Sequence, residues 1–287
     1  MEYGCQSMVK PLRKVLVKRP DKAFAVDDPA RWHYVDRPNL KIAQQEHDAL
    51  VAILRQAGAE VIYHDEFQSD RADAIFVHDP AIITHQGAVI LRMGKALRRG
   101  EEATMARRFE ALGVAVYYTL HDEALAEGGD LLWIDDSTLA VGQGFRTNAE
   151  GLCQLREALT GLGVDTVPVP LPYHAGPQAC LHLMSFISIV DHQVAVIYSP
   201  LMPVPFWQFL KNRGFRFIEV PEEEFETMGT NVLALSPGQC LMLKGNPITR
   251  RRLQEAGCQV FTYQGKEISL KAEGGATCLT RPILRRD

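Results

Sequence analysis

The run AGAEVIYH at residues 57–64 is the first of five similar runs in the chain. The others read LGVAVYYT (112–119), LGVDTVPV (162–169), RGFRFIEV (213–220) and AGCQVFTY (256–263). In each run a glycine fits the left-handed cap of a helix, and a short strand-like segment follows it. These glycines recur at intervals of 43 to 55 residues. A fixed interval of this size indicates an internal structural repeat.

Each repeat also contains elements upstream of its glycine. Apolar residues at helical spacing predict helices over 44–56, 101–112 and 149–162. Pairs of strand-like runs joined by a turn predict hairpins. Three pairs are clear, at 131–134 with 138–141, 186–190 with 194–198, and 232–235 with 240–243. A less regular pair combines 75–77 with 81–84, continued by 88–91, and the chain end supplies 277–284.

The repeating unit is therefore a hairpin, a helix and a strand. A plain doubly wound parallel sheet is the alternative, but it needs one strand per helix, whereas this chain supplies about three. Five such units arranged radially close on themselves without a long exposed strand edge. We expect a single catalytic domain over 1–287, folded as a five-bladed α/β propeller. The run 14–18 would complete the blade that the terminal hairpin begins.

The composition excludes several classes of protein. The chain has 287 residues, with 31 basic and 35 acidic residues and a net charge of -4, so nothing draws it to nucleic acid or to a membrane surface. Its apolar stretches are too short to cross a bilayer, and no secretory signal precedes them. Six cysteines without a CxxC pair predict reduced thiols and a cytoplasmic protein. No HExxH motif or paired histidine spacing indicates a metal site.

Polar residues recur at nearly the same distance after each repeat glycine. Asp79 and Cys278 follow at +21, His182 at +19, and Asp130 and Asn231 at +17. Equivalent positions in a ring of modules meet near its axis. We therefore expect carboxylate, imidazole and thiol groups to converge there.

The motifs around these positions resemble those of a known family. They are D-x-x-F-V-x-D-P at 73–80, RRGE at 98–101, EGGD at 127–130, RTN at 146–148, HLxS at 182–185, and the Gly-Gly pair at 274–275 before Cys278. Together they resemble the guanidine-modifying enzymes of the pentein superfamily, most closely the dimethylarginine dimethylaminohydrolase branch. The resemblance covers about 72–280. It implies a five-bladed α/β propeller that needs no metal or organic cofactor.

The resemblance also implies roles for individual residues. Cys278 would be the nucleophile, His182 the acid and base, and Glu127 the carboxylate that orients His182. Asp79, aided by Asp73, would hold the guanidinium. The candidates for the substrate carboxylate are Arg146 and either Arg98 or Arg99, and Asp130 is grouped with the substrate-binding residues.

The implied activity is hydrolysis of a substituted guanidine such as N-methylated arginine, through a covalent thiouronium. Position 78 is His, where the family usually has an acidic residue, so the guanidine substrate stays open. Met184 replaces the Asp of deiminases and amidinotransferases, which favours the dimethylaminohydrolase branch. The alternatives are an arginine deiminase-like hydrolase, an amidinotransferase, and a non-enzymatic binding pentein. The expected partner is a small guanidino compound, with a homodimer as a candidate assembly.

Two further expectations concern the site in operation. Residues 28–39 are rich in turn formers and aromatics and belong to no repeat, so they are predicted to form part of a lid. The Cys278 thiol has no fixed cation beside it in the sequence. We therefore expect it to be largely neutral in the free enzyme and to ionise when a guanidinium binds.

Overall fold

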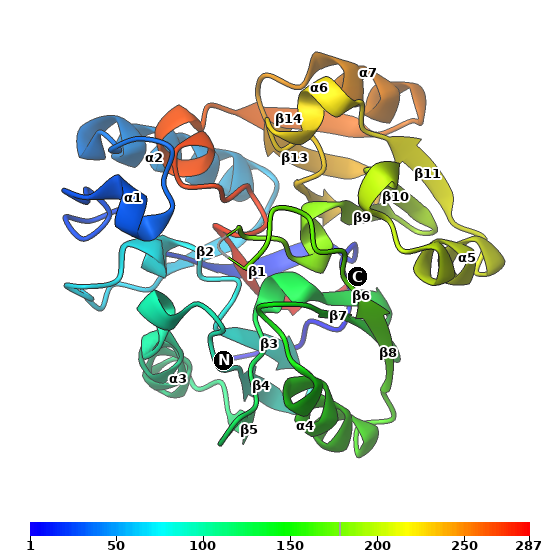
Figure 1. The fold of residues 1–287 in the computed structure, drawn as a ribbon, viewed down its shortest axis with the longest axis horizontal. Coiled ribbons are helices and arrows are strands. Elements are labelled where there is room, and N and C mark those ends of the chain that lie inside the picture. Colours follow the sequence, from blue (N-terminus) through cyan, green and yellow to red (C-terminus); the bar gives the residue numbers. More distant parts are fainter. Residues whose placement is uncertain (178) are drawn as a thin grey trace.

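The computed structural model describes residues 1–177 and 179–287, and its strands form five three-stranded sheets arranged as a ring (Figure 1). The first sheet is β15 (Arg281–Arg285), β1 (Leu12–Val17) and β2 (Glu60–Tyr63). The others are β3 (Ala81–Thr84), β4 (Gly87–Ile90) and β5 (Val116–Thr119); β6 (Leu131–Asp135), β7 (Thr138–Gln143) and β8 (Asp165–Pro170); β9 (Ile187–Asp191), β10 (Val194–Ile197) and β11 (Arg216–Glu219); and β12 (Val232–Ser236), β13 (Gln239–Leu243) and β14 (Gln259–Tyr263).

Every blade has the same pairing. Two strands pair antiparallel, and the third strand, which follows a helix, joins the central strand in parallel. The longer connecting helices are α2 (Leu40–Gln56), α3 (Glu101–Ala111), α4 (Ala149–Thr160), α5 (Val204–Asn212) and α7 (Pro247–Glu255), and they lie around the outside of the ring (Figure 1). This arrangement confirms the predicted five-bladed α/β propeller.

The five repeat glycines all have left-handed backbones. Their φ angles are 90° at Gly58, 73° at Gly113, 70° at Gly163, 82° at Gly214 and 94° at Gly257. A side chain at φ values of this kind is strained, so glycine lets each helix turn directly into the next strand. The sequence pattern that predicted the repeat therefore has a conformational cause.

The ring is closed by the two ends of the chain. β15 pairs antiparallel with β1, and β1 pairs in parallel with β2. A further bridge joins Gly4 to Leu284. The first and last segments thus complete one blade, as predicted. Its central strand β1 has a partner on each side.

Two predicted hairpins are wrong in detail. Residues Ala72–Ile75 form a 3-10 turn, and the hairpin of the second blade is made by β3 and β4 alone. The chain end contributes the single strand β15, since its hairpin partner is β1 at the opposite end of the sequence. In both places residues with high β propensity lie in loops instead of strands. These loops carry polar residues to the ring centre.

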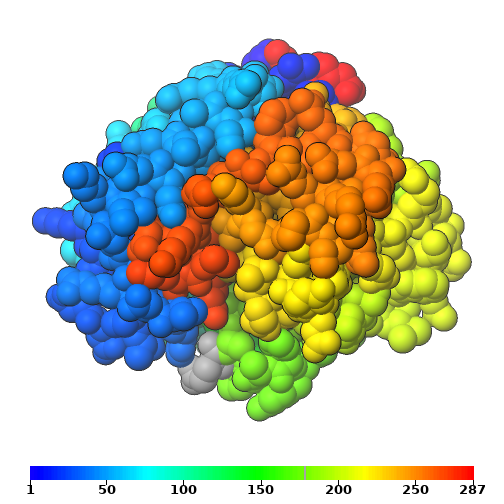
Figure 2. All heavy atoms as spheres, turned by 90° about the horizontal axis from the view of Figure 1, so that it is seen from above, coloured from blue at the N-terminus to red at the C-terminus, as the bar shows by residue number. Residues whose placement is uncertain are grey.

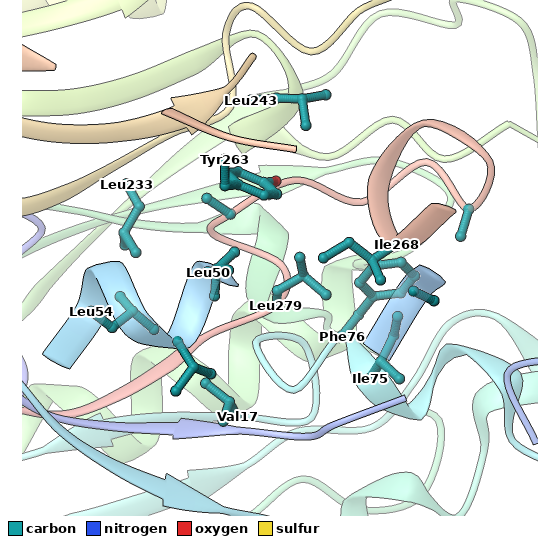
Figure 3. Packing of buried hydrophobic residues seen from close by; sticks show 14 of the residues in the cluster. Val17, Leu50, Leu54, Ile75, Phe76, Leu233, Leu243, Tyr263, Ile268 and Leu279 are labelled. Atoms are coloured by element: carbon teal, nitrogen blue, oxygen red, sulfur yellow. The ribbon is translucent and has the colours of Figure 1, made fainter. Parts of the chain in front are cut away.

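The core lies between the blades and their helices as several clusters of buried residues. The largest includes Leu50, Phe76, Ile268 and Leu279, which pack together in Figure 3. Cys278 packs against this cluster from its edge. The residue after the predicted nucleophile is therefore anchored in the core, which fixes the backbone at the site.

The segment before Cys278 contacts the N-terminal part of the chain. The turn Lys266–Leu270 packs on α2, and Figure 2 shows this orange-red segment between the blue N-terminal residues and the yellow and orange fifth blade. Within the described parts of the chain, no helix combines the length and apolarity required to cross a membrane.

Candidate active site

One cavity of about 390 Å³ opens at the centre of the ring and receives residues from every blade. Among its lining residues are seven that the sequence analysis assigned to the site, namely Asp73, Asp79, Arg98, Glu127, Arg146, His182 and Cys278. The remaining two, Arg99 and Asp130, do not line it. Of the five polar positions in phase with the repeat, Asp79, His182, Asn231 and Cys278 line the cavity and Asp130 does not, so the predicted convergence holds for four of them.

His182 and Glu127 form a buried pair in this cavity. The imidazole Nε2 lies 2.7 Å from Glu127 Oε2, and both side chains are almost completely enclosed. Burial acts to lower the pKa of His182, but the Cys180, Asp130 and Glu127 groups outweigh it and hold that pKa well above its usual value. Burial likewise acts to raise the pKa of Glu127, and the hydrogen bond from His182 lowers it. The pair therefore has the electrostatics of an imidazolium and a carboxylate.

The second imidazole nitrogen, Nδ1, is the one available for proton transfer. Its only described neighbour within hydrogen-bonding range is the exposed thiol of Cys180, at 3.6 Å, and a thiol is a weak partner. Gly129 packs against the ring, since a Cβ at that position would lie 2.4 Å from Nδ1. The EGGD motif therefore supplies a carboxylate and, two residues later, the space that the imidazole occupies.

Cys278 is half-buried at the end of a loop that Asn231 holds in place. Asn231 Oδ1 accepts a hydrogen bond from the Thr277 amide at 3.0 Å, and its Nδ2 lies 3.5 Å from the Cys278 sulfur. A Cβ at Gly275 would lie 2.3 Å from Asn231. The glycine pair before the cysteine thus permits close approach of protein side chains to the loop backbone.

The thiol of Cys278 is held neutral by its surroundings. Burial and the Asp79 carboxylate raise its pKa to about 11, although His182 acts in the opposite direction. In the free protein at neutral pH the thiol is thus protonated. Ionisation of the thiol by a bound cation stays a prediction.

Asp79 presents a fixed carboxylate to the same cavity. Its Oδ1 accepts from the Gly129 amide at 3.0 Å and its Oδ2 from the Arg98 guanidinium at 2.5 Å. Burial acts to raise the pKa of Asp79, but Arg98 and His182 lower it below its usual value. The group is therefore ionised beside the thiol, where it can hold a guanidinium by charge-assisted hydrogen bonds.

The two candidate arginines of the RRGE motif occupy different environments. Arg98 is buried, and its guanidinium donates to Asp79 and Glu101 and to the Phe76 carbonyl. Arg99 is exposed and its carbonyl accepts from Arg71. Arg98 thus supports Asp79 from the wall of the cavity, and Arg99 lies outside it.

Asp130 lies beneath the site and takes part in local structure. Its Oδ1 accepts from the Leu183 amide at 2.9 Å and its Oδ2 from the Thr147 hydroxyl at 2.6 Å. Burial raises the pKa of Asp130 to about 6. Through its hydrogen bond with the Leu183 amide, Asp130 connects the turn that carries Glu127 with the turn that follows His182.

His78 stands where the family usually has an acidic residue. In the structure its imidazole is buried and uncharged at neutral pH. Its Nδ1 lies 2.9 Å from the Thr280 carbonyl, and burial, with Arg281, lowers its pKa to about 3. A neutral imidazole at this position leaves Asp79 as the ionised group of the pair. This end of the cavity thus carries one less negative charge than an acidic residue at 78 would give.

Among the cavity residues that were assigned no role from the sequence, three lie beside the assigned ones. Lys95 follows a glycine in a loop and has the pattern of a solvated residue, yet its ammonium pairs with Asp73 at 2.6 Å. Asn231 was in phase with the repeat, which was a usable signal. Cys180 lies two residues before His182, and nothing in its sequence context distinguishes it.

Among residues 1–177 and 179–287, no group of three or more His, Cys, Asp and Glu side chains is placed to hold a metal ion.

The predicted lid segment borders the cavity. Asp28 caps the short helix α1 (Pro29–Trp32), and Trp32 and His33 line the cavity. The Val35 amide donates to the Lys271 carbonyl at 2.8 Å, which connects the segment to the loop before Cys278. Whether the segment moves stays a prediction.

The fold and the cavity place the chain in the pentein superfamily, and comparison with known proteins defines the family. Residues 30–285 match the family model described as N,N dimethylarginine dimethylhydrolase, eukaryotic. The N(G),N(G)-dimethylarginine dimethylaminohydrolase of Streptomyces coelicolor is 32% identical over 94% of this chain and 96% of that one. The chain therefore belongs to the dimethylarginine dimethylaminohydrolase family, a family of hydrolases that act on guanidino compounds.

Two further comparisons give a similar sequence and a similar fold. The uncharacterised protein YkgA of Bacillus subtilis is 30% identical over 98% of this chain and 95% of its own length. The fold matches that of the Pseudomonas aeruginosa dimethylarginine dimethylaminohydrolase, solved in complex with citrulline, with a TM-score of 0.79 and 22% identity over 94% of this chain and 99% of that one.

Proposed function

We propose that the protein is a cysteine-dependent hydrolase that replaces one nitrogen of a substituted guanidine by oxygen. The observation that carries the proposal is the convergence of the Cys278 thiol, the His182–Glu127 pair and the Asp79 carboxylate in one cavity. A guanidinium is cationic and resonance-stabilised, so its central carbon resists attack. Catalysis therefore needs a strong nucleophile, a fixed orientation and an acid for the leaving amine.

The first half of the reaction forms a covalent intermediate. Asp79 holds the guanidinium by charge-assisted hydrogen bonds, and the bound cation lowers the pKa of Cys278 by stabilising its thiolate. The thiol proton passes to solvent, since the His182 imidazolium is already protonated. The sulfur forms a bond to the central carbon, and a C–N π pair moves onto nitrogen. The tetrahedral adduct then collapses, the C–N bond to the leaving group breaks, and His182 gives its proton to the departing amine.

The second half releases the product. His182, now neutral, takes a proton from water, and the resulting hydroxide attacks the carbon of the S-alkylthiouronium. Collapse of this adduct breaks the C–S bond and regenerates the thiolate, leaving a ureido product of the citrulline type. Glu127 stabilises the imidazolium each time it forms and keeps Nδ1 directed away from the carboxylate.

The experiment that tests the proposal is replacement of the nucleophile. We expect Cys278→Ser to abolish turnover of guanidino compounds while leaving the melting temperature and circular dichroism unchanged, because a hydroxyl is a far weaker nucleophile than a thiolate. The exposed cysteine Cys153 provides a matched control, Cys153→Ser, which should retain activity. Mass spectrometry of the quenched wild-type protein should detect the adduct on Cys278. Near-normal turnover by Cys278→Ser would contradict covalent catalysis, and transfer to an added amine in place of water would indicate an amidinotransferase.

A further inference from the structure

The cavity contains a lysine whose ammonium is already fixed by the protein. Lys95 Nζ donates to Asp73 Oδ2 at 2.6 Å and to the Trp32 carbonyl at 2.8 Å. Its backbone amide donates to Glu127 Oε1 at 2.9 Å, so its position is tied to that of the His182–Glu127 pair. An ammonium has three N–H donors. With two of them engaged, the third is left for a ligand in the cavity that Lys95 lines.

Each carboxylate oxygen of Asp73 already accepts a hydrogen bond from a group of the protein. Tyr34 donates its hydroxyl to Asp73 Oδ1 at 2.8 Å, and Lys95 binds Oδ2. The sequence analysis assigned Asp73 to help hold the guanidinium. In the structure Lys95 is bound to it, so a cationic group of a substrate that approaches Asp73 meets another ammonium there.

Arg146 supplies a second cation with free donors to the same cavity. Its relative exposure is 6%, so the side chain is almost completely buried. Its Nε has no hydrogen-bond partner among the described residues. Nη1 lies 3.9 Å from Glu127 and Nη2 lies 3.5 Å from the Ala179 carbonyl, which are long contacts. A buried guanidinium with an unused donor is satisfied best by an anionic ligand.

We infer that Lys95 determines the substrate class: the cavity accepts a guanidino carboxylate that has no free ammonium beside its carboxylate, with the carboxylate bound between Lys95 and Arg146. This inference rests on the proposed function and names the substrate within it. In an α-amino acid the ammonium is attached to the carbon next to the carboxylate. That geometry brings it close to the fixed Lys95 charge, and like-charge repulsion is strong in a partly desolvated site.

Several other charged groups face the cavity. Asp79, Glu127, His182 and Arg98 belong to the reacting end and are mutually paired. His33 adds no positive charge at neutral pH, because burial, with Lys95 and Arg146, lowers its pKa. Two exposed carboxylates remain on the cavity wall, Glu226 and Glu273. They are the alternative binding site for a substrate ammonium, and the Glu273→Gln variant tests that alternative.

The test compares two substrates that differ by the α-ammonium. We expect the wild-type protein to favour 4-guanidinobutyrate over arginine in kcat/KM, with N-methylated forms of each following the same order. Lys95→Gln keeps donors for Asp73 and the Trp32 carbonyl but removes the charge. It should lower kcat/KM for 4-guanidinobutyrate about tenfold or more, mainly through KM, and leave arginine less affected. Lys95→Arg should restore the preference, and Lys244→Met, an exposed lysine outside the cavity, should change neither substrate.

A binding measurement makes the inference independent of turnover. Pentanoate has the carboxylate without the guanidinium, and it should protect Cys278 from iodoacetamide in the wild-type protein and protect it less in Lys95→Gln. Equal selectivity in wild-type and Lys95→Gln, with both proteins folded, would overturn the inference. A preference for arginine that Glu273→Gln abolishes would also overturn it, and would place the ammonium at Glu273. Failure of the proposed function is distinguishable, because then no guanidine would be turned over and no adduct would form on Cys278.

Discussion

The Asn231 carboxamide bridges the Cys278 side chain and the loop that carries it: Nδ2 lies 3.5 Å from the Cys278 sulfur, and Oδ1 accepts from the Thr277 amide. Asn231 comes from the turn before β12 and Cys278 from the turn before β15, so two blades meet at the sulfur. An amide donor favours a thiolate over a thiol, because it hydrogen-bonds to the charged form.

Asn231 is therefore expected to act as a positioning residue. Asn231→Ala should lower kcat by about 10- to 100-fold, because the thiolate loses a donor and the loop loses its attachment. Asn231→Asp keeps the Thr277 contact but places a carboxylate beside the sulfur, so it should raise the pKa of the thiol further. Iodoacetamide inactivation against pH checks this. An unchanged alkylation profile in both variants would mean that Asn231 has only a structural role.

The ionisation of Cys278 should depend on the ligand. With a pKa of about 11 in the free protein, the rate of alkylation by iodoacetamide should rise about tenfold per pH unit from neutral pH to pH 10. A small non-reactive amidine that leaves the sulfur accessible should raise the rate at neutral pH, since a cation lowers the pKa of a neighbouring thiol. An apparent pKa well below neutral without ligand would instead assign the ionisation to the His182 imidazolium.

The neighbouring arginines Arg98 and Arg99 should respond in opposite ways to substitution. Arg98→Met leaves the Asp79 and Glu101 carboxylates buried without their cation, and should cost about 3–5 kcal/mol of unfolding free energy. Burial raises the pKa of Glu101 to about 7 even with Arg98 present. Arg99→Met is the matched control and should change stability by less than about 0.5 kcal/mol. Urea unfolding measures both, and equal effects would contradict the structural assignment of Arg98.

The segment 28–39 should become protected when a ligand binds. It contributes Trp32 and His33 to the cavity and contacts the loop before Cys278 through the Val35 and Lys271 backbones. Hydrogen exchange with and without a substrate analogue is the measurement, and the helix α5, on the outer face, serves as the internal control. Protection that does not change on binding would exclude a role as a lid.

The sequence predicted the blades well and the fine electrostatics poorly, for physical reasons. The repeat glycines report a backbone requirement that is local, so Gly58 and its four counterparts could be recognised without a structure. Lys95 and Arg98 could not be assigned in this way. Whether a charged side chain is solvated or buried depends on partners from other segments, here Asp73 for Lys95 and Asp79 for Arg98, and pairing of this kind has no signature in spacing alone.

The pairing of β1 with β15 has a consequence for how the protein is made. During synthesis β1 emerges before the other strands of the ring and its partner β15 emerges after them, so the first blade waits with an open edge while the other blades are made. An unpaired strand edge is a template for association with other chains, which makes this interval the time of greatest exposure to aggregation. Cys278 precedes β15 in the sequence. The nucleophile and the strand that closes the ring therefore arrive together, so no partly synthesised ring carries the reactive thiol.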